Sequence, residues 1–279
     1  MCKYDEQVAD YLDYCENVRR MSKQTLHIKK WCLKDFKKCV GLNDISQITN
    51  NDIMRWVKCM TGRNCSARTV NCRMAHIWAC VRYLNEIGIS MPNLNRTLIV
   101  KMKESPIKRI YYTKEQIEKV LNCADRMEWL MIQLCFECGF RISELRSLRL
   151  DDIDGNKVTF IGKGSKLREV YMSDETRSKL DCWIQAERVD DYLWANSRGG
   201  PICVEEIRHR LQKPFYKAGF TNFHPHALRH SFATNICSNG APLPIAQRML
   251  GHKHITTTER YVHTFDNHLS DYFSEYAFA

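Results

Sequence analysis

A polar, proline-containing segment at residues 93–111 constrains this chain most, because it interrupts the helical pattern that precedes it. Pro92 stands at its start and Pro106 lies within it. Proline, asparagine and serine residues in such a segment terminate helices and strands, and they are typical of connections between domains. The chain has 279 residues, 44% of them hydrophobic, which is enough for two cores. We therefore expect a domain at 1–92, a linker at 93–111 and a second domain at 112–279.

The two parts differ in charge. Residues 1–110 carry 20 basic and 10 acidic side chains, whereas residues 111–279 carry 22 of each. The whole net charge of +10 therefore belongs to the first part. A basic bias of this size is typical of a surface that binds the phosphate backbone of double-stranded DNA. A solvated basic surface is the alternative that charge alone leaves open.

Apolar residues recur at helical spacing through the first part, which predicts a helical domain. We expect four helices there, the later three at about 24–39, 50–60 and 66–87, after a first helix that contains Val8 to Cys15. Basic side chains between the apolar positions are candidate contacts to DNA phosphates, although each alone is more often a solvated charge. These candidates are Lys23, Lys29, Lys30, Arg63, Arg68 and Arg73.

The second part predicts a mainly α fold with a small β-sheet, that is, an α+β domain. Thr113 is expected to cap the first helix, and a buried helix follows at about 126–138. A small sheet is expected at 157–172. Further helices are expected at 174–187, 204–218, 226–238 and 243–250, followed by an amphipathic tail helix at 265–277.

Cysteine is frequent, with 14 residues, but its spacing does not indicate a metal site. The only C-x-x-C pair is Cys135–Cys138, which lies in an apolar run without a second pair at a zinc-ligand distance. We expect buried thiols in a reducing compartment and no metal. No run of 18 apolar residues and no signal peptide are found, so we expect no membrane partner and a cytoplasmic, nucleoid-associated protein.

Residues 224–263 gather side chains that can act on a phosphodiester. His226, Arg229, His252 and Tyr261 lie in this segment, and Arg141 follows a glycine turn upstream. An arginine fork fits phosphate oxygens, a histidine transfers protons near neutral pH, and a tyrosine can be a covalent nucleophile. By its distance to Arg229, His226 fits a catalytic position better than the neighbouring His224.

A basic hairpin tip is predicted between two strand-like runs, Val158 to Ile161 and Glu169 to Met172. Gly162 and Gly164 flank Lys163 in the sequence GKGSKLRE. A lysine at such a tip can reach into a groove. Lys166 is the competing candidate.

Four segments, in this order, resemble the catalytic boxes of the tyrosine recombinases, the phage integrases and Xer-type recombinases. They read GFRISELRSLRLDDI, IGKGSKLREV, HPHALRHSFAT and LGHKHITTTERYVH. The resemblance covers the whole chain, strongly over 111–263 and weakly before it. It implies a four-helix SAM-like core-binding domain followed by a tyrosine-recombinase catalytic domain. Because the helical pattern starts within the first residues, we expect no additional arm-binding domain.

The resemblance also implies a role for each matching residue. Arg141 and Arg229 would clamp the scissile phosphate, and His226 would transfer a proton at the nucleophile. The resemblance places the acid for the leaving 5′ oxygen at Lys163 rather than Lys166. His252 would hydrogen-bond a phosphate oxygen, Tyr261 would carry the 3′-phosphotyrosyl link, and Glu144 would orient catalytic groups.

These side chains would supply the chemistry without a cofactor. Positive charge from arginine, lysine and histidine would take the place of Mg²⁺ at the anionic phosphate. The covalent link would retain the energy of the broken bond, so rejoining would need no ATP. Two other functions stay open on the residues: a type IB topoisomerase that nicks and reseals, and a DNA-binding protein of this fold without catalysis.

The biological role is also open between two alternatives. Integration or excision of a mobile element is the leading hypothesis, and Xer-like resolution of chromosome or plasmid dimers is the other. The resemblance implies a dimer on one site and a homotetramer on paired sites. It also implies that the tail helix at 265–277 docks on a neighbouring protomer.

Overall fold

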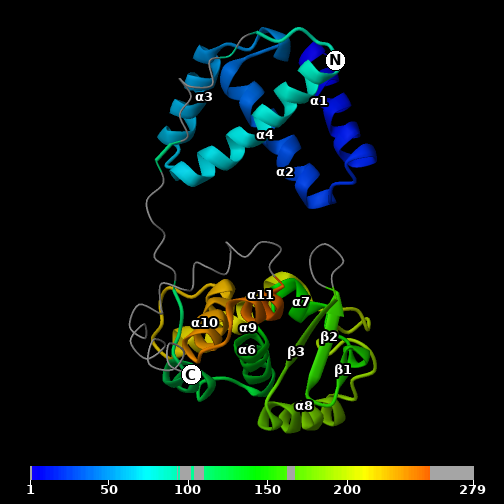
Figure 1. Cartoon of the computed structure of the whole chain (residues 1–279), viewed down its shortest axis with the longest axis vertical. Helices are drawn as coiled ribbons and strands as arrows, with labels where there is room; N and C mark the ends of the chain where they lie inside the picture. Colours follow the sequence, from blue (N-terminus) through cyan, green and yellow to red (C-terminus); the bar gives the residue numbers. More distant parts are fainter. Residues whose placement is uncertain (1, 93, 95–101, 104–109, 162–166, 252–279) are drawn as a thin grey trace, which may run out of the picture. The chain divides into compact units, whose positions relative to one another are not determined.

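A computed structural model describes residues 2–92, 94, 102–103, 110–161 and 167–251. The chain forms two compact units, Met1–Ile107 and Lys108–Ala279, whose boundary falls inside the segment expected to be the linker (Figure 1). Lys163, Lys166, His252, Tyr261 and the tail segment 265–277 lie outside the described residues. Each unit is considered by itself.

The first unit is helical in its described part. Its elements are α1 (Lys3–Asp13), the π-helical turn η1 (Tyr14–Val18), α2 (Lys23–Val40), the 3₁₀ turn η2 (Ile45–Gln47), α3 (Asn50–Gly62) and α4 (Ala67–Glu86). The four α-helices agree with the expected positions. The hydroxyls of Ser22 and Ser66 accept a hydrogen bond from the third residue beyond them, so they cap the starts of α2 and α4.

The core of the first unit combines buried aromatic and aliphatic side chains. Trp56 and Phe36 are almost fully buried, with ring centroids 6.0 Å apart. Tyr4 is buried as well, and its hydroxyl donates to the carbonyl of Leu33 at 2.7 Å. Burial of each large apolar side chain stabilises the fold by roughly 1.5–3 kcal/mol. The apolar positions of all four helices meet in this one core.

The second unit combines helices with one sheet. Its helices are α5 (Lys114–Leu121), α6 (Arg126–Cys138), α7 (Ile142–Arg146), the 3₁₀ turn η3 (Leu150–Asp152), α8 (Asp174–Glu187), α9 (Val204–Lys217), α10 (Pro225–Ser238) and α11 (Leu243–Leu250). Thr113 caps α5 as expected. The short helix α7 was not expected from the sequence.

Three antiparallel strands form the sheet, in the order β1 (Ile153–Asp154), β2 (Lys157–Ile161) and β3 (Leu167–Tyr171). Val158 pairs with Val170, and Phe160 pairs with Arg168. These four side chains are buried, so they form the inward face of the hairpin. The sequence predicted the hairpin, but it placed the second strand at 169–172 and did not predict β1.

Helix α6 lies at the centre of the second unit. Leu130, Met131, Ile132, Leu134 and Cys135 are all at most 2% exposed, so the helix is buried around most of its circumference. It packs against α8, α9, α10 and β3. Helix α8 lies at one end of this unit, and α7 and α11 lie at the other (Figure 1). The C-terminus of α6 points toward the end that carries α7 and α11.

The 14 cysteines are all free thiols, six of them buried. Cys72, Cys182 and Cys203 are exposed. Among the described residues, no helix is long and apolar enough to cross a membrane, and no cluster of three metal-ligating side chains is found.

Candidate active site

A glycine turn at the end of α6 positions Arg141. Gly139 ends the helix in the left-handed conformation, with φ of +61°. A Cβ atom at Gly139 would lie 2.3 Å from Cδ1 of Phe232 in α10, so no larger residue fits without displacing that ring. The chain then leaves the helix with Arg141 as the residue that precedes α7.

The carboxylate of Glu144 organises the start of α7. Its Oε2 accepts a hydrogen bond of 2.8 Å from the backbone N–H of Arg141, and its Oε1 pairs with the Arg141 guanidinium. The bond to the Arg141 N–H is the one that a glutamate three residues into a helix gives to the capping residue. Glu144 is 9% exposed, whereas the Arg141 side chain keeps 24% of its surface exposed. Glu144 therefore holds Arg141 by both its backbone and its guanidinium, while part of the side chain stays exposed to solvent.

Helix α10 carries the next two candidates. Pro225 occupies its first turn, where a missing N–H costs nothing. His226 and Arg229 follow three residues apart and therefore share one face of the helix. The Nη1 of Arg229 donates to the carbonyl of Gly139 at 2.6 Å, and its Nη2 donates to the carbonyl of Leu250. The same Nη1 lies 3.8 Å from Glu144 Oε2, so α10 and the α7 turn meet at this carboxylate.

The environment of His226 favours its neutral form. Partial desolvation lowers the pKa of the imidazole, and the positive charge of Arg229 adds to the effect, followed by His224 and Arg141. A neutral imidazole at pH 7 can accept a proton. His224 stands outside the helix as its N-terminal cap residue and is exposed, with its ring 6.5 Å from that of His230.

A third arginine, Arg168, joins Arg141 and Arg229 at Glu144, and these three residues form the arginine cluster. The sequence did not predict this position for Arg168. It comes from β3, is 3% exposed, and its Nη1 donates to Glu144 Oε2 at 2.9 Å. Burial lowers the pKa of its guanidinium to about 10, an effect that Glu144 opposes. The available signal was the strand alternation, which puts Arg168 on the same face as the buried Val170. Starting the strand at Glu169 hid that signal.

Described residues flank the segment that contains Lys163 and immediately precede His252. Ile161 and Leu167 are the last pair of the β2–β3 hairpin before the connecting segment that contains Lys163. Gly251 follows α11 and is the last described residue before His252. The ends of these two segments therefore belong to the same unit as Arg141 and Arg229.

The basic candidates of the first unit have different environments. Lys23, Lys30 and Arg68 are exposed. Arg63 is exposed but pairs with Asp35 at 2.7 Å, and the Arg73 guanidinium lies over the Trp31 ring, 4.2 Å from its centroid.

Lys29 does not have the environment expected of a phosphate contact. It is 5% exposed, and its ammonium donates to the Tyr11 hydroxyl at 2.6 Å. A buried ammonium held in this way does not face solvent. We therefore leave Lys29 out of the proposed DNA contacts.

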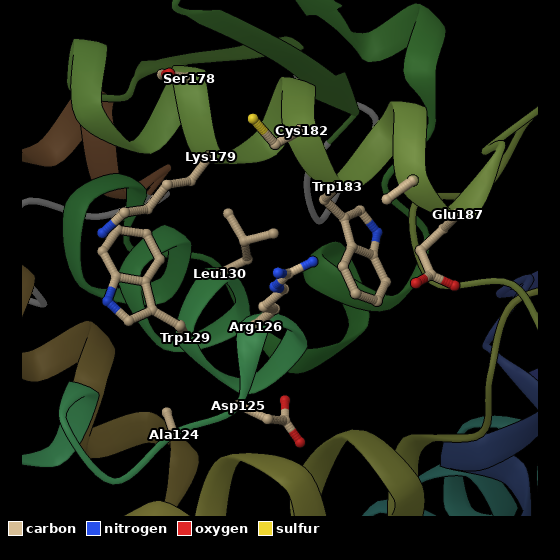
Figure 2. Close-up of a pocket in the computed structure, with 11 residues that line it drawn as sticks. Ala124, Asp125, Arg126, Trp129, Leu130, Ser178, Lys179, Cys182, Trp183 and Glu187 are labelled. Carbon is tan, nitrogen blue, oxygen red and sulfur yellow. The ribbon is translucent and has the colours of Figure 1, made fainter.

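A separate pocket of about 590 Å³ lies between α6 and α8 (Figure 2). Trp129 and Trp183 line it, and the Lys179 ammonium lies 3.7 Å from the centroid of the Trp129 ring. Asp125 and Arg126 place this pocket at the first turn of α6, whereas the arginine cluster is at the last turn. The pocket is therefore not part of the candidate active site.

Comparison with known proteins points to one family. Residues 101–268 match the phage integrase family. Tyrosine recombinase XerC of Oceanobacillus iheyensis is 28% identical over 255 residues, which cover 85% of this chain and 83% of that protein. Tyrosine recombinase XerC of Lactobacillus delbrueckii subsp. bulgaricus is also 28% identical, over 93% of this chain and 95% of its own.

Solved structures share the fold at lower identity. A Tn1549 transposon integrase in complex with transposon right end DNA has a TM-score of 0.78 at 18% identity, covering 99% of this chain and 100% of its own. The XerH site-specific recombinase bound to a palindromic difH substrate has a TM-score of 0.74 at 19% identity, covering 96% of this chain and 84% of its own. Since the family match alone spans more than half of the sequence, the chain belongs to the phage integrase family of tyrosine recombinases.

Proposed function

We propose that this protein is a site-specific DNA recombinase that cleaves and rejoins DNA strands through a 3′-phosphotyrosyl link at Tyr261. The observation that carries the proposal is the meeting of Arg141 and Arg229 at Glu144, with His226 on the same helix face as Arg229. Two guanidiniums from separate elements can stabilise negative charge on a phosphodiester, and His226 can accept the proton of the attacking hydroxyl.

The first chemical step is attack of the Tyr261 hydroxyl oxygen on phosphorus. His226 takes the phenolic proton, the bond from phosphorus to the 5′ oxygen breaks, and Lys163 gives that oxygen a proton. A free tyrosine has a pKa of about 10, so it needs such help at neutral pH. Rejoining runs the same steps in reverse, with a 5′ hydroxyl as the attacking group.

Arg141 and Arg229 act on charge at the phosphate. The equatorial oxygens gain negative charge in the transition state, and fixed guanidiniums stabilise this charge without reorganising. Loss of one such donor typically costs about 10²–10³ in rate. His252 adds a hydrogen bond to a phosphate oxygen. Because these side chains carry the positive charge, the proposed reaction uses no metal and no ATP.

Tyr261→Phe tests the proposal directly. The variant should bind a duplex selected from a random pool as tightly as wild type, yet form no covalent complex on a nicked suicide form of that duplex. The assay is denaturing electrophoresis of labelled DNA. Covalent complex in the variant would contradict the assignment of Tyr261, and its absence in wild type would contradict recombinase activity. Transfer of the trapped strand to a second half-site separates a recombinase from a topoisomerase-like enzyme.

The proposed partner is double-stranded DNA, held by the basic first unit and cut by the second. One duplex site takes a dimer, and two paired sites take a homotetramer, in the cytoplasm at the nucleoid. In this proposal the tail at 265–277 docks on the neighbouring protomer. Its residues Leu269, Tyr272, Phe273 and Tyr276 repeat at helical spacing. Truncation after His263 should abolish assembly on paired sites in native electrophoresis, and an unchanged tetramer would contradict the docking.

For the biological role we propose integration or excision of a mobile element, and the fold it shares with the Tn1549 transposon integrase fits this proposal. Xer-like dimer resolution is the second candidate, because the two relatives compared above are both named XerC. Mapping the selected DNA site onto the genome that encodes the chain separates the two. Sites at the two ends of an insertion support the first role, and one chromosomal site outside any insertion supports the second.

A further inference from the structure

Two helix C-termini converge on the candidate active site. Helix α6 ends before Gly139 and α11 ends before Gly251, and both glycines have φ of +61°. The last carbonyls of a helix lack partners within the helix and carry partial negative charge. Carbonyls from two helices that point at one region repel each other, so donors or cations must lie between them.

Arg168 is bound to both helix ends at once. Its Nε donates to the carbonyl of Met249 in α11, and its Nη2 donates to the carbonyls of Cys138 and Gly139 at 2.8 and 3.3 Å. Its Nη1 donates to Glu144. Each of the three guanidinium nitrogens therefore donates to a different element: Nε to α11, Nη2 to the end of α6 and Nη1 to Glu144 in α7. Among the side chains, only arginine offers three such donors in one plane.

Arg229 makes a closely similar set of contacts from α10. It shares the Gly139 carbonyl with Arg168, and it binds Leu250, the residue next to Met249. Both guanidiniums also lie near Glu144 Oε2, at 2.9 Å for Arg168 and 3.8 Å for Arg229. The position of Arg229 therefore depends on the Gly139 carbonyl and the Glu144 carboxylate that Arg168 also binds, and on the end of α11 that Arg168 holds through Met249.

The packing around Arg168 leaves little room for movement. A Cβ atom at Gly251 would lie 3.2 Å from its Cδ, and the Phe160 ring centroid lies 5.0 Å from its guanidinium carbon. A side chain that is 3% exposed does not reach a DNA phosphate. Any effect of Arg168 on catalysis must therefore act through the residues that it holds.

We propose that Arg168 is a positioning residue that sets the spacing between Arg141 and Arg229 at the scissile phosphate. It does so by holding the Glu144 carboxylate and the carbonyl ends of α6 and α11 in one arrangement. This inference rests on the proposed assignment of Arg141 and Arg229 to the phosphate. A displacement of about 1 Å at such groups can cost about a hundredfold in rate.

Arg168→Lys in the full chain tests the proposal, because lysine keeps the charge but replaces the fork by one donor atom. Arg177→Lys is the matched control, since Arg177 also binds a carboxylate and a carbonyl but lies in α8. The rate of covalent complex formation is measured at saturating protein on the selected suicide duplex. A second duplex carries a methylphosphonate at the scissile position, which removes the negative charge that the arginines neutralise.

Arg168→Lys should cleave the phosphodiester about a hundredfold more slowly than wild type, with DNA affinity unchanged. Its defect should be clearly smaller on the methylphosphonate, because a neutral centre depends less on the arginine pair. Arg177→Lys should match wild type on both duplexes. Melting curves establish that each variant is folded at the assay temperature. If Arg168→Lys does not melt cooperatively, Arg168→Gln serves instead, since its amide still donates to one carbonyl.

Two results would overturn the proposal. Wild-type cleavage by the folded variant would remove any role for Arg168. An equal defect on both duplexes would assign it a purely structural role. Arg141→Ala distinguishes failure of the inference about Arg168 from failure of the proposed function. If this variant cleaves like wild type, the assignment of Arg141 to the scissile phosphate is wrong, whatever the result for Arg168→Lys.

Discussion

The two units use basic side chains in opposite ways. In the second unit Arg168 and Arg229 are buried, and each is bound by backbone carbonyls of two helices. In the first unit Lys23, Lys30 and Arg68 are exposed on helices or beside their starts. Yet the first unit, residues 1–107, holds +8 of the net charge of +10, while the second holds only +2.

The net charge of a unit therefore does not indicate where the chemistry takes place. Binding a DNA backbone needs many exposed cations whose individual positions matter little, because the attraction is electrostatic and additive. Stabilising one phosphate in a transition state needs a few cations at fixed positions, and fixing them requires burial and counter-charges such as Glu144. Substitutions in the second unit should therefore change rate, and substitutions in the first should change affinity.

Among variants that keep Tyr261, the largest expected effect is at Lys163. Lys163→Ala should slow cleavage by about 10²–10⁴-fold, the usual contribution of a positioned acid. A substrate with a 5′-bridging phosphorothiolate, whose thiolate leaving group needs no proton, should restore most of the rate. Lys166→Ala is the matched control and should cleave normally. If the thio substrate rescues Lys166→Ala instead, Lys166 is the acid. If Lys163→Ala loses DNA affinity but keeps its cleavage rate, the expected separation of rate and affinity between the two units is wrong.

A moderate effect is expected from pH. The pKa of His226 is lowered, so the neutral imidazole persists until the pH falls below the ordinary histidine value of about 6.5. Cleavage should stay level from neutral pH down to about 6.5 and fall below it, and His226→Gln should be slow without this acidic limb. Unfolding takes up a proton at a histidine of lowered pKa, so stability also declines below about pH 6.5. Melting curves at each pH separate the two effects, and an unchanged limb in His226→Gln would exclude His226 as its origin.

The smallest effects are expected in the first unit. Lys23→Ala, Lys30→Ala and Arg68→Ala should each weaken DNA binding a few-fold and lower the slope of log affinity against log salt by about 0.9 per lost phosphate contact. Cleavage at saturating protein should not change. Lys29→Met is the control, because the buried Lys29 is not expected to contribute to the slope. Fluorescence anisotropy over a salt series measures both quantities, and a reduced cleavage rate in the exposed variants would contradict the separation of roles.

Much of the fold could be predicted because its elements carry their own signals. Helix α6 reads as a long apolar run between Asp125 and Gly139, which supply its cap and its termination. Helix α10 begins at a proline, and α5 follows a threonine cap. Glycines separate the two strand-like runs of the hairpin in the sequence. These local features decide secondary structure without help from distant contacts.

The remaining features depend on tertiary contacts. The residues next to Lys29 in the sequence do not indicate that it is buried, because Tyr11, whose hydroxyl it contacts, belongs to another helix. Arg168 looks like one more surface charge until Glu144 and the ends of α6 and α11 surround it. The short helix α7 has only five residues, too few for a periodic pattern. The sequence therefore predicts the catalytic candidates by type, but not which buried residue holds them.

The distribution of thiols makes this chain suitable for distance measurements without extensive mutagenesis. Maleimide dyes react through the thiolate, and burial raises the pKa of Cys80 and of Cys135 to about 12. Exposed thiols such as Cys72 in the first unit and Cys182 and Cys203 in the second should therefore take up label first. With Cys203→Ser, a donor at Cys72 and an acceptor at Cys182 would report by energy transfer how the two units approach each other when a duplex is added.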